Sequence, residues 1–371
     1  MDLTTTAYGT WSGGRFMHFG ETLDEERFLN CIRTAYDSGV RTFLTSDVYG
    51  AGRADKFLGE ALSDKPRDSY CLVGMVGHDF YNAERQGSKG FPRFCDPALR
   101  GEDEYADFLK FCTEKSLENC GTDHFDLLML HNPGERGFSN DKVWEAMETL
   151  RSAKLTERLG IAPGPANGFT LDLIHAFEQY GSSIDWAMII LNPNEPWPGQ
   201  LVLPAAEKFG VDLLTRVVDH GGIFHDDIKP GHELKPGDHR AFRPDGWIEH
   251  GNEKMEQMRP IADKYGISMI ELACIWNLSQ SPVKSVTPTF IQEQNEGARP
   301  IEEKIKNFGK LSDIRLTSEE VKMISKIGDN TGCMTLKGAS QRHATSERPD
   351  EWPMRPELLE VAERYELAGT W

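Results

Sequence analysis

The chain has 371 residues, long enough for one large α/β barrel or for two ordinary domains. It carries 41 basic and 59 acidic residues, a formal net charge of −18, and no long basic run, which argues against nucleic acid as a partner. The first residues lack the basic and apolar regions of a signal peptide, and no stretch approaches the ~20 apolar residues of a membrane span. We therefore expect a cytoplasmic protein with no membrane partner.

The seven cysteines are scattered, with no CxxC pair and no Cys/His spacing of the zinc type, which indicates reduced thiols. The stretch "DHGGIFHDD" (219–227) brings His and Asp together, but it matches no standard ligand pattern. We predict no metal site.

From residue 22 to residue 289, amphipathic helices alternate with short apolar runs, which is typical of βα units around a parallel sheet. Thr22 and Glu25 form a predicted capping box for the first helix, whose apolar face includes Phe28.

Eight apolar or β-branched runs are predicted to be buried strands: 6–11, 40–45, 70–76, 125–131, 158–162, 186–192, 211–218 and 283–289. Eight strands with helices between them predict a (β/α)8 TIM barrel, an α/β fold. A doubly wound open sheet is the alternative, and the absence of a GxGxxG turn weighs against it.

Three segments do not fit the repeat. Residues 77–103 follow the third strand and residues 219–252 follow the seventh, so both long loops belong at the carboxyl-end face, where barrels keep their sites. We divide the chain into a barrel, 1–328, and a tail, 329–371, with a short helix predicted around "RPELLEVAERYEL". The tail would fold over that same face or contact another subunit, so a homo-oligomer stays open.

Two motifs carry a family resemblance: "TSDVYGAGRADKFLGEAL" (45–62) and "GTDHFDLLMLHNP" (121–133). Together with "GTW" at the first strand and "SVTP" at the eighth, they resemble the aldo-keto reductase superfamily from about Thr6 to Gly328. The resemblance implies carbonyl reduction, in which a Tyr donates a proton, a Lys and an Asp lower its pKa, a His orients the carbonyl and NADPH delivers hydride.

Only half of that catalytic set is present. The Tyr matches Tyr49 and the His matches His131, whereas the Asp falls on Leu44 and the Lys on Met75. The resemblance therefore identifies the barrel while leaving the chemistry open.

The cofactor positions have changed as well. The family's Ser-Asn pair falls on Ala162 and Pro163, its Gln on Met188, and the aromatic that stacks on nicotinamide on Arg216. Ala, Pro and Met offer no side-chain amide or hydroxyl, and a guanidinium beside an oxidised nicotinamide would place two cations together. Asn307 matches an adenine-contacting Asn, if NAD(P) binds at all.

The loop after the eighth strand, "TPTFIQEQNEGARPIEEKIKN", carries acidic side chains that would repel a 2′-phosphate. We therefore favour no cofactor, and NAD(P)H belongs to the reductase alternative.

Three residues are the predicted catalytic group: Tyr49 as acid/base, His131 to polarise a carbonyl or share the proton, and Arg216 to hold an anion and lower the pKa of Tyr49. For Arg216 the alternative is a structural salt bridge to Asp219, Asp185 or Glu195.

Further residues are candidate contacts to a small-molecule substrate, with core packing or a solvated loop as their alternative: Trp11, His78, Asn132, Asn192 and His220.

The favoured function is an enzyme with non-redox proton-transfer chemistry, a lyase or isomerase acting on a small carbonyl or sugar-derived substrate. One alternative is an NAD(P)H-dependent oxidoreductase with compensating residues. Another is a non-catalytic ligand-binding relative.

Overall fold

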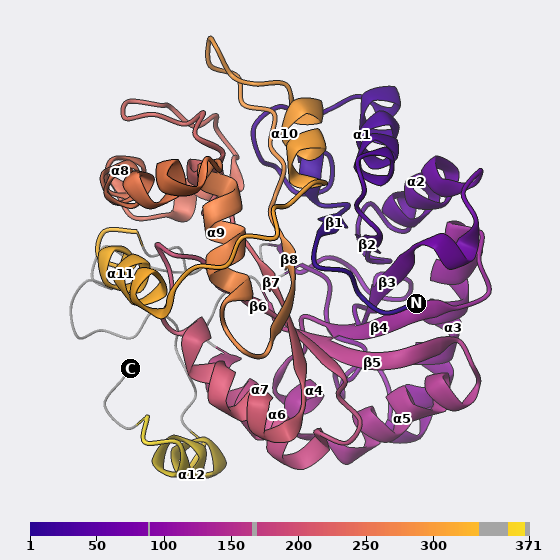
Figure 1. Cartoon of the computed structure of the whole chain (residues 1–371). Helices are drawn as coiled ribbons and strands as arrows, with labels where there is room; N and C mark the ends of the chain where they lie inside the picture. Colours follow the sequence, from indigo (N-terminus) through magenta and orange to yellow (C-terminus); the bar gives the residue numbers. More distant parts are fainter. Residues whose placement is uncertain (88–89, 165–168, 334–354, 368–371) are drawn as a thin grey trace.

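A computed structural model describes residues 1–87, 90–164, 169–333 and 355–367. Its sheet has eight parallel strands in the order β1 to β8, and a bridge between Thr6 and Val286 brings the last strand back to the first (Figure 1). The strands are β1 (Ala7–Gly9), β2 (Thr42–Leu44), β3 (Cys71–Val76), β4 (Phe125–His131), β5 (Thr156–Ala162), β6 (Trp186–Ile190), β7 (Asp212–Arg216) and β8 (Val283–Thr287). The predicted (β/α)8 barrel is confirmed.

Most strand residues are buried on both faces of the sheet, so most of the strand sequences are runs of apolar residues rather than alternating patterns. Glu157 in β5 and Lys284 in β8 are exposed. One face packs on the outer helices, and the other fills the barrel interior, which includes Trp11, Leu44, Met75, Ala162 and Met188. This interior cluster closes the barrel below its carboxyl-end face.

The helices surround the strands (Figure 1). They are α1 (Glu25–Asp37), α2 (Arg53–Leu62), α3 (Tyr105–Cys120), α4 (Glu135–Ser139), α5 (Asp141–Ser152), α6 (Thr170–Tyr180), α7 (Leu203–Phe209), α8 (Trp247–Tyr265), α9 (Met269–Leu278), α10 (Ile301–Phe308), α11 (Ser318–Gly328) and α12 (Pro356–Arg364). None of the helices in the described ranges is long and apolar enough to cross a membrane.

The start of α1 differs from the prediction. Asp24 is its N-cap and accepts a hydrogen bond from the backbone N–H of Arg27, whereas the Thr22 hydroxyl donates to the carbonyl of Gly14. Asp24 takes the N-cap position in place of Thr22 because it lies directly before the first helical turn. From there its carboxylate accepts from the free N–H groups, and its negative charge interacts favourably with the positive end of the helix dipole.

The long loops follow β3 and β7, at the carboxyl-end face. The first folds back on itself through an antiparallel bridge between His78 and Arg93. The second ends sooner than predicted, because α8 already begins at Trp247.

Buried ion pairs fasten the loop after β7 to the loop after β8. The Arg240 guanidinium bonds both carboxylate oxygens of Asp238, both of Glu293 and the carbonyl of Gly221. The backbone N–H of Thr289 donates to Asp219 at 2.7 Å. The two loops therefore behave as one unit over this side of the face.

The predicted C-terminal helix is α12, which packs on α6 at the flank of the barrel (Figure 1). Arg355 pairs with Asp172 at 2.7 Å, and Arg364 pairs with Glu178 at 2.5 Å. Most of the predicted tail lies outside the described residues.

Candidate active site

Tyr49, His131 and Arg216 come together at the carboxyl ends of three strands. Tyr49 follows β2, and His131 and Arg216 are the last residues of β4 and β7. The rings of Tyr49 and His131 are perpendicular, with centroids 5.6 Å apart, and Tyr49 borders the interior cluster that contains Leu44 and Met75. The positions that bear Asp and Lys in the resemblance are therefore apolar packing beneath the phenol.

His131 is held by Ser46. The Ser46 hydroxyl lies 2.8 Å from His131 Nδ1 and donates to the carbonyl of Met75 at 2.9 Å. A hydroxyl has only one hydrogen, so with that hydrogen on the Met75 carbonyl its oxygen accepts from Nδ1–H. This arrangement leaves Nε2 of the neutral imidazole as a hydrogen-bond acceptor.

Both groups are neutral at physiological pH. Burial, together with the positive charges of Arg93 and Arg216, lowers the pKa of His131 to about 3. Burial raises the pKa of Tyr49 to about 12, and Arg216 acts against that rise. The site therefore holds a protonated phenol beside an uncharged imidazole.

The loop after β3 contributes His78 and Arg93 next to His131. The His78 ring lies 4.9 Å from the His131 ring, and the Asn132 amide lies 3.5 Å from His78 Nε2. Arg93 donates to the carbonyl oxygens of Asn132 and Phe91. The structure thus brings together two predicted contacts, His78 and Asn132, with Arg93, which the sequence did not single out.

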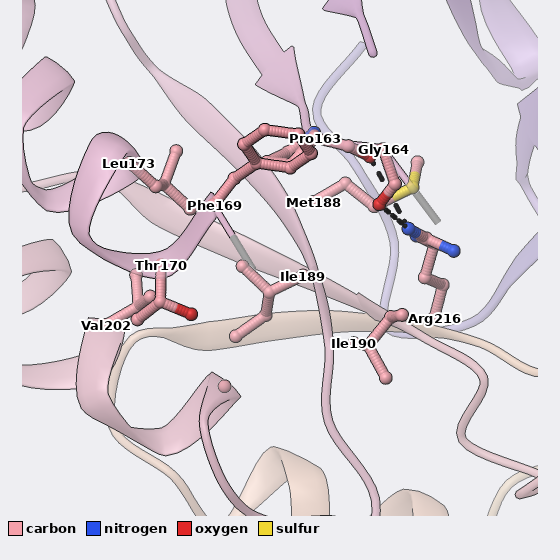
Figure 2. A pocket seen from close by; sticks show the side chains of 11 residues that line it. Pro163, Gly164, Phe169, Thr170, Leu173, Met188, Ile189, Ile190, Val202 and Arg216 are labelled. Carbon is pink, nitrogen blue, oxygen red and sulfur yellow. Dashed lines mark hydrogen bonds between the residues drawn. The ribbon is translucent and has the colours of Figure 1, made fainter. Parts of the chain in front are cut away.

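Arg216 makes none of the salt bridges considered for it. Its Nη2 donates to the carbonyl oxygens of Gly164 at 2.6 Å and Pro163 at 3.4 Å, at the end of β5 (Figure 2). Arg216 forms no ion pair with a carboxylate in the described part of the chain, and Asp185 pairs with Arg151 instead. The guanidinium therefore keeps its charge available to the site.

A small pocket of about 20 Å³ lies beside Arg216 (Figure 2). Its walls come from the ends of β5, β6 and β7 and from the elements that follow: Pro163, Gly164, Phe169, Thr170, Leu173, Met188, Ile189, Ile190, Gly199, Val202 and Arg216. Such a volume is close to that of one water, so a larger ligand needs these walls to move.

The remaining predicted contacts include Trp11, which belongs to the interior cluster that Tyr49 borders, and two residues with polar partners in the loops after β6 and β7. Trp11 is 6% exposed and packs in the interior cluster, as its alternative supposed. The Asn192 amide donates to the carbonyl of Val217 and to Glu195, and its oxygen accepts from the N–H of Asn194, so its polar groups shape the loop after β6. 

His220 is fully buried, with Nδ1 3.7 Å from Glu195 Oε2 and its ring 5.9 Å from that of Trp247. Burial lowers the pKa of His220 to about 4, although Glu195 acts in the opposite direction. It therefore belongs to a second polar cluster under the loop after β7.

Asn307 is exposed near the end of α10 and lines a surface depression with Asp37 and Ser38, at the end of α1. Because α1 runs back toward the amino ends of the strands, this depression lies away from Tyr49.

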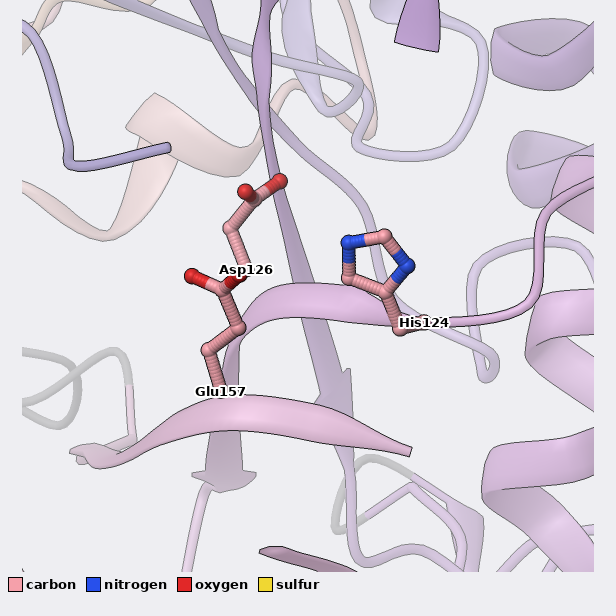
Figure 3. Close-up of side chains that lie close together, drawn as sticks. All are labelled: His124, Asp126 and Glu157. Atoms are coloured by element: carbon pink, nitrogen blue, oxygen red, sulfur yellow. The ribbon is translucent and has the colours of Figure 1, made fainter. Parts of the chain in front are cut away.

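One group of possible metal ligands consists of His124, Asp126 and Glu157 at the amino ends of β4 and β5 (Figure 3). The oxygens of its central carboxylate already have hydrogen-bond donors. Asp126 accepts from Arg67 at 2.9 Å, from the N–H of Leu72 at 2.7 Å and from the terminal amine of Met1. These cations occupy the place a metal would need, so the group is an ion-pair network.

A model of the aldo/keto reductase family matches residues 7–329. The chain belongs to this family. It is similar to the NADH-specific methylglyoxal reductase of Escherichia coli strain K12, with 25% identity over 298 residues, 76% of this chain and 85% of that protein.

Two solved structures show the same fold. The glycerol dehydrogenase of Gluconobacter oxydans matches with a TM-score of 0.68 and 20% identity, over 96% of each chain. An aldo/keto reductase from Klebsiella pneumoniae, in complex with NADP and acetate, matches with a TM-score of 0.58 and 18% identity, over 88% of this chain and 91% of that one.

These relatives contradict the expectation that no nicotinamide cofactor is favoured, because one is NADH-specific and another holds NADP on this fold. The expectation was wrong because it counted only a few side chains, those at the nicotinamide end and the acidic residues near a 2′-phosphate. A dinucleotide is long, and backbone groups and distant charges contribute to its binding.

Arg243, in the loop after β7, is a residue of this chain that fits such an anionic cofactor. It is 9% exposed, and its Nε and Nη1 have no hydrogen-bond partner among the described residues. The guanidinium lies 4.5 Å from the Trp247 ring centroid, and a Cβ on Gly221 would be only 2.9 Å from it, so only glycine leaves room there. A buried guanidinium with unused donors is a binding group for a phosphate oxygen.

Sequence reasoning missed Ser46, Arg93 and Arg243. Ser46 lies within the motif around Tyr49, and a small polar residue at a strand end was a usable signal. Arg93 and Arg243 lie in long loops without periodicity, and no pattern in the sequence ties either to the barrel.

Proposed function

We propose that this protein is an NAD(P)H-dependent oxidoreductase that reduces a small carbonyl compound. The observation that carries the proposal is the protonated Tyr49 phenol beside His131, with the Arg216 charge acting on both. Family membership and the oxidoreductase relatives support this alternative over the lyase or isomerase favoured from the sequence.

Tyr49 donates its proton to the carbonyl oxygen as that oxygen becomes an alkoxide. Arg216 takes the part of the missing lysine, because its positive charge favours the phenolate that remains. The His131 ring lies perpendicular to the phenol, and its Nε2 would accept a hydrogen bond from the O–H of the alcohol product, which forms when Tyr49 has given its proton to the carbonyl oxygen. With Nδ1 carrying the proton, Nε2 cannot donate to the carbonyl, so the polarising role predicted for His131 is not part of this proposal. When bound, the cofactor supplies the hydride.

The cofactor would be held at its phosphates by Arg243. Two cations beside the loop after β8 pair with carboxylates: Lys304 with Asp227, and Arg27 with Glu302 at 2.7 Å. Arg240 is likewise shared between Asp238 and Glu293. Arg299, in the loop itself, donates to the carbonyl of His225 and has no ion pair with a carboxylate among the described residues, whereas Glu296 and Glu303 place negative charge beside it. Because these acidic groups oppose a 2′-phosphate, we propose that NADH is preferred over NADPH.

The test is a titration of the protein with NADH and with NADPH, followed by tryptophan fluorescence. We expect NADH to bind at micromolar concentration and at least tenfold more tightly than NADPH. Tyr49→Phe should keep NADH affinity within about twofold and lower carbonyl reduction by about 100-fold or more. Tyr180→Phe, on the outer helix α6, is the matched control and should change neither. Failure of both nucleotides to bind at millimolar concentration would overturn the proposal.

A further inference from the structure

The site around His131 contains two guanidinium groups whose hydrogen bonds within the described ranges go to backbone carbonyls. Arg93 reaches the carbonyls of Asn132 and Phe91, and Arg216 reaches those of Gly164 and Pro163. Arg100 and Arg240 differ, because each pairs with a carboxylate. A half-buried guanidinium without an anion carries a desolvation penalty. Two of them at one site therefore indicate that an anionic ligand binds there.

Two carboxyl groups in the loops after β2 and β3, those of Asp47 and Asp79, make no ion pair with Arg93 or Arg216 in the described part of the chain. Asp79 pairs with Arg100 and accepts from the backbone N–H of Asn82. Asp47 is 1% exposed, burial raises its pKa well above the usual range of a carboxyl, and it is not among the groups that shift the pKa of His131. Glu195 acts on the charge of Arg216 from a distance without an ion pair between them, so two guanidinium groups near His131 keep their charge within a chain of net charge −18.

Each guanidinium also retains N–H groups beyond those it gives to the backbone. Arg93 uses Nε and Nη1 for its carbonyl partners, and Arg216 uses Nη2. The backbone bonds fix each planar group in place, which lowers the entropy lost when a further oxygen binds. The imidazole of His131 lies within the electrostatic reach of both charges.

We propose that the substrate is an oxo acid, with its carbonyl at Tyr49 and its carboxylate between Arg93 and Arg216. The inference rests on the proposed function and names the substrate class for the same site. A carboxylate suits two fixed forks because its two planar oxygens accept from both, whereas a neutral aldehyde leaves both charges without an anion. The loop bridge between His78 and Arg93 makes the loop after β3 the element that sets this specificity.

The experiment measures calorimetric binding of 4-oxobutanoate and of butanal, its uncharged counterpart, with and without NADH. We expect 4-oxobutanoate to bind at least tenfold more tightly than butanal. Arg93→Met and Arg216→Met should each weaken binding of the acid by roughly 10- to 100-fold and leave butanal within about twofold. Arg93→Lys keeps the positive charge but loses the two parallel N–H donors of the guanidinium. Its affinity for 4-oxobutanoate should lie between those of Arg93→Met and the parent protein. Arg33→Met, on the exposed face of α1, is the control and should change neither ligand.

Two outcomes separate this inference from the proposed function. If 4-oxobutanoate binds as expected but NADH does not, the proposed reduction fails and the anion site stands. If butanal is bound and reduced as well as 4-oxobutanoate, the reduction stands and the oxo-acid inference is overturned. Inorganic phosphate serves as a third ligand, and a phosphate that binds more tightly than the acid would overturn the assignment to a carboxylate. Each variant's melting temperature shows whether a loss of binding reflects unfolding.

Discussion

The hydroxyl of Ser46 lies 2.8 Å from Nδ1 of His131 and donates to the carbonyl of Met75 on the neighbouring strand. One hydroxyl hydrogen serves one acceptor, so the link to β3 determines which nitrogen of His131 bears its proton. The tautomer of His131 is therefore set by Ser46, which is not one of the proposed catalytic residues.

Removing the Ser46 hydroxyl should change the tautomer of His131 and leave the other side chains of the site in place. Ser46→Ala leaves Nδ1 without its partner, so both imidazole tautomers become populated. We expect kcat to fall about tenfold with KM within twofold, and the ¹⁵N chemical shifts of His131 to move toward a tautomer mixture. Ser63→Ala, at the exposed end of α2, is the control. An unchanged ¹⁵N spectrum would remove Ser46 from this role.

The pH dependence follows from the pKa values of the two neutral groups. Tyr49 has a pKa of about 12 and His131 of about 3, so neither ionises between pH 5 and pH 9. Carbonyl reduction, which needs the protonated phenol, should be flat across that range. Alcohol oxidation needs the phenolate, and it should rise about tenfold per pH unit.

Arg216→Met tests the origin of this profile. Loss of the positive charge raises the pKa of Tyr49 further, so alcohol oxidation at pH 9 should slow by more than carbonyl reduction does. Rates of the two directions measured from pH 5 to pH 10 check this, and equal slowing would mean that Arg216 does not act on the phenol.

Much of the fold was predictable, because buried parallel strands and amphipathic helices leave separate periodicities in the sequence. Tyr49 and His131 were predictable from motifs, since strand ends place them at one face. Arg216 was recognised as unusual, yet its partners turned out to be carbonyls of β5, which no local pattern reveals. Arg93 and Arg243 depend on how long loops fold back, and loop conformation follows from tertiary contacts rather than from local preference.

The buried ion pairs between the loop after β7 and the loop after β8 lead to a prediction about the stability of the protein. Arg240 is almost fully buried between Asp238 and Glu293, so Arg240→Met would leave two carboxylates without a cation. We expect a loss of about 3–5 kcal/mol in the free energy of unfolding, measured with urea. Arg136→Met removes an exposed pair with Glu102 and should cost less than about 1 kcal/mol. Similar losses in both variants would show that the buried network stabilises no more than a surface pair.

The apolar layer beneath Tyr49 can be tested by restoring charge to it. Leu44 and Met75 are 0% and 1% exposed and belong to one interior cluster, so Leu44→Asp alone buries an unpaired carboxyl and should cost about 3–5 kcal/mol. 

Adding Met75→Lys supplies a partner, and the double variant should recover about 1–3 kcal/mol relative to the sum of the two single changes. A lysine beneath the phenol should also lower the pKa of Tyr49 below about 12, which the pH profile of alcohol oxidation would report. Additive losses, with an unchanged profile, would show that the two side chains do not meet under Tyr49. In that case Arg216 alone would account for the electrostatics of the phenol.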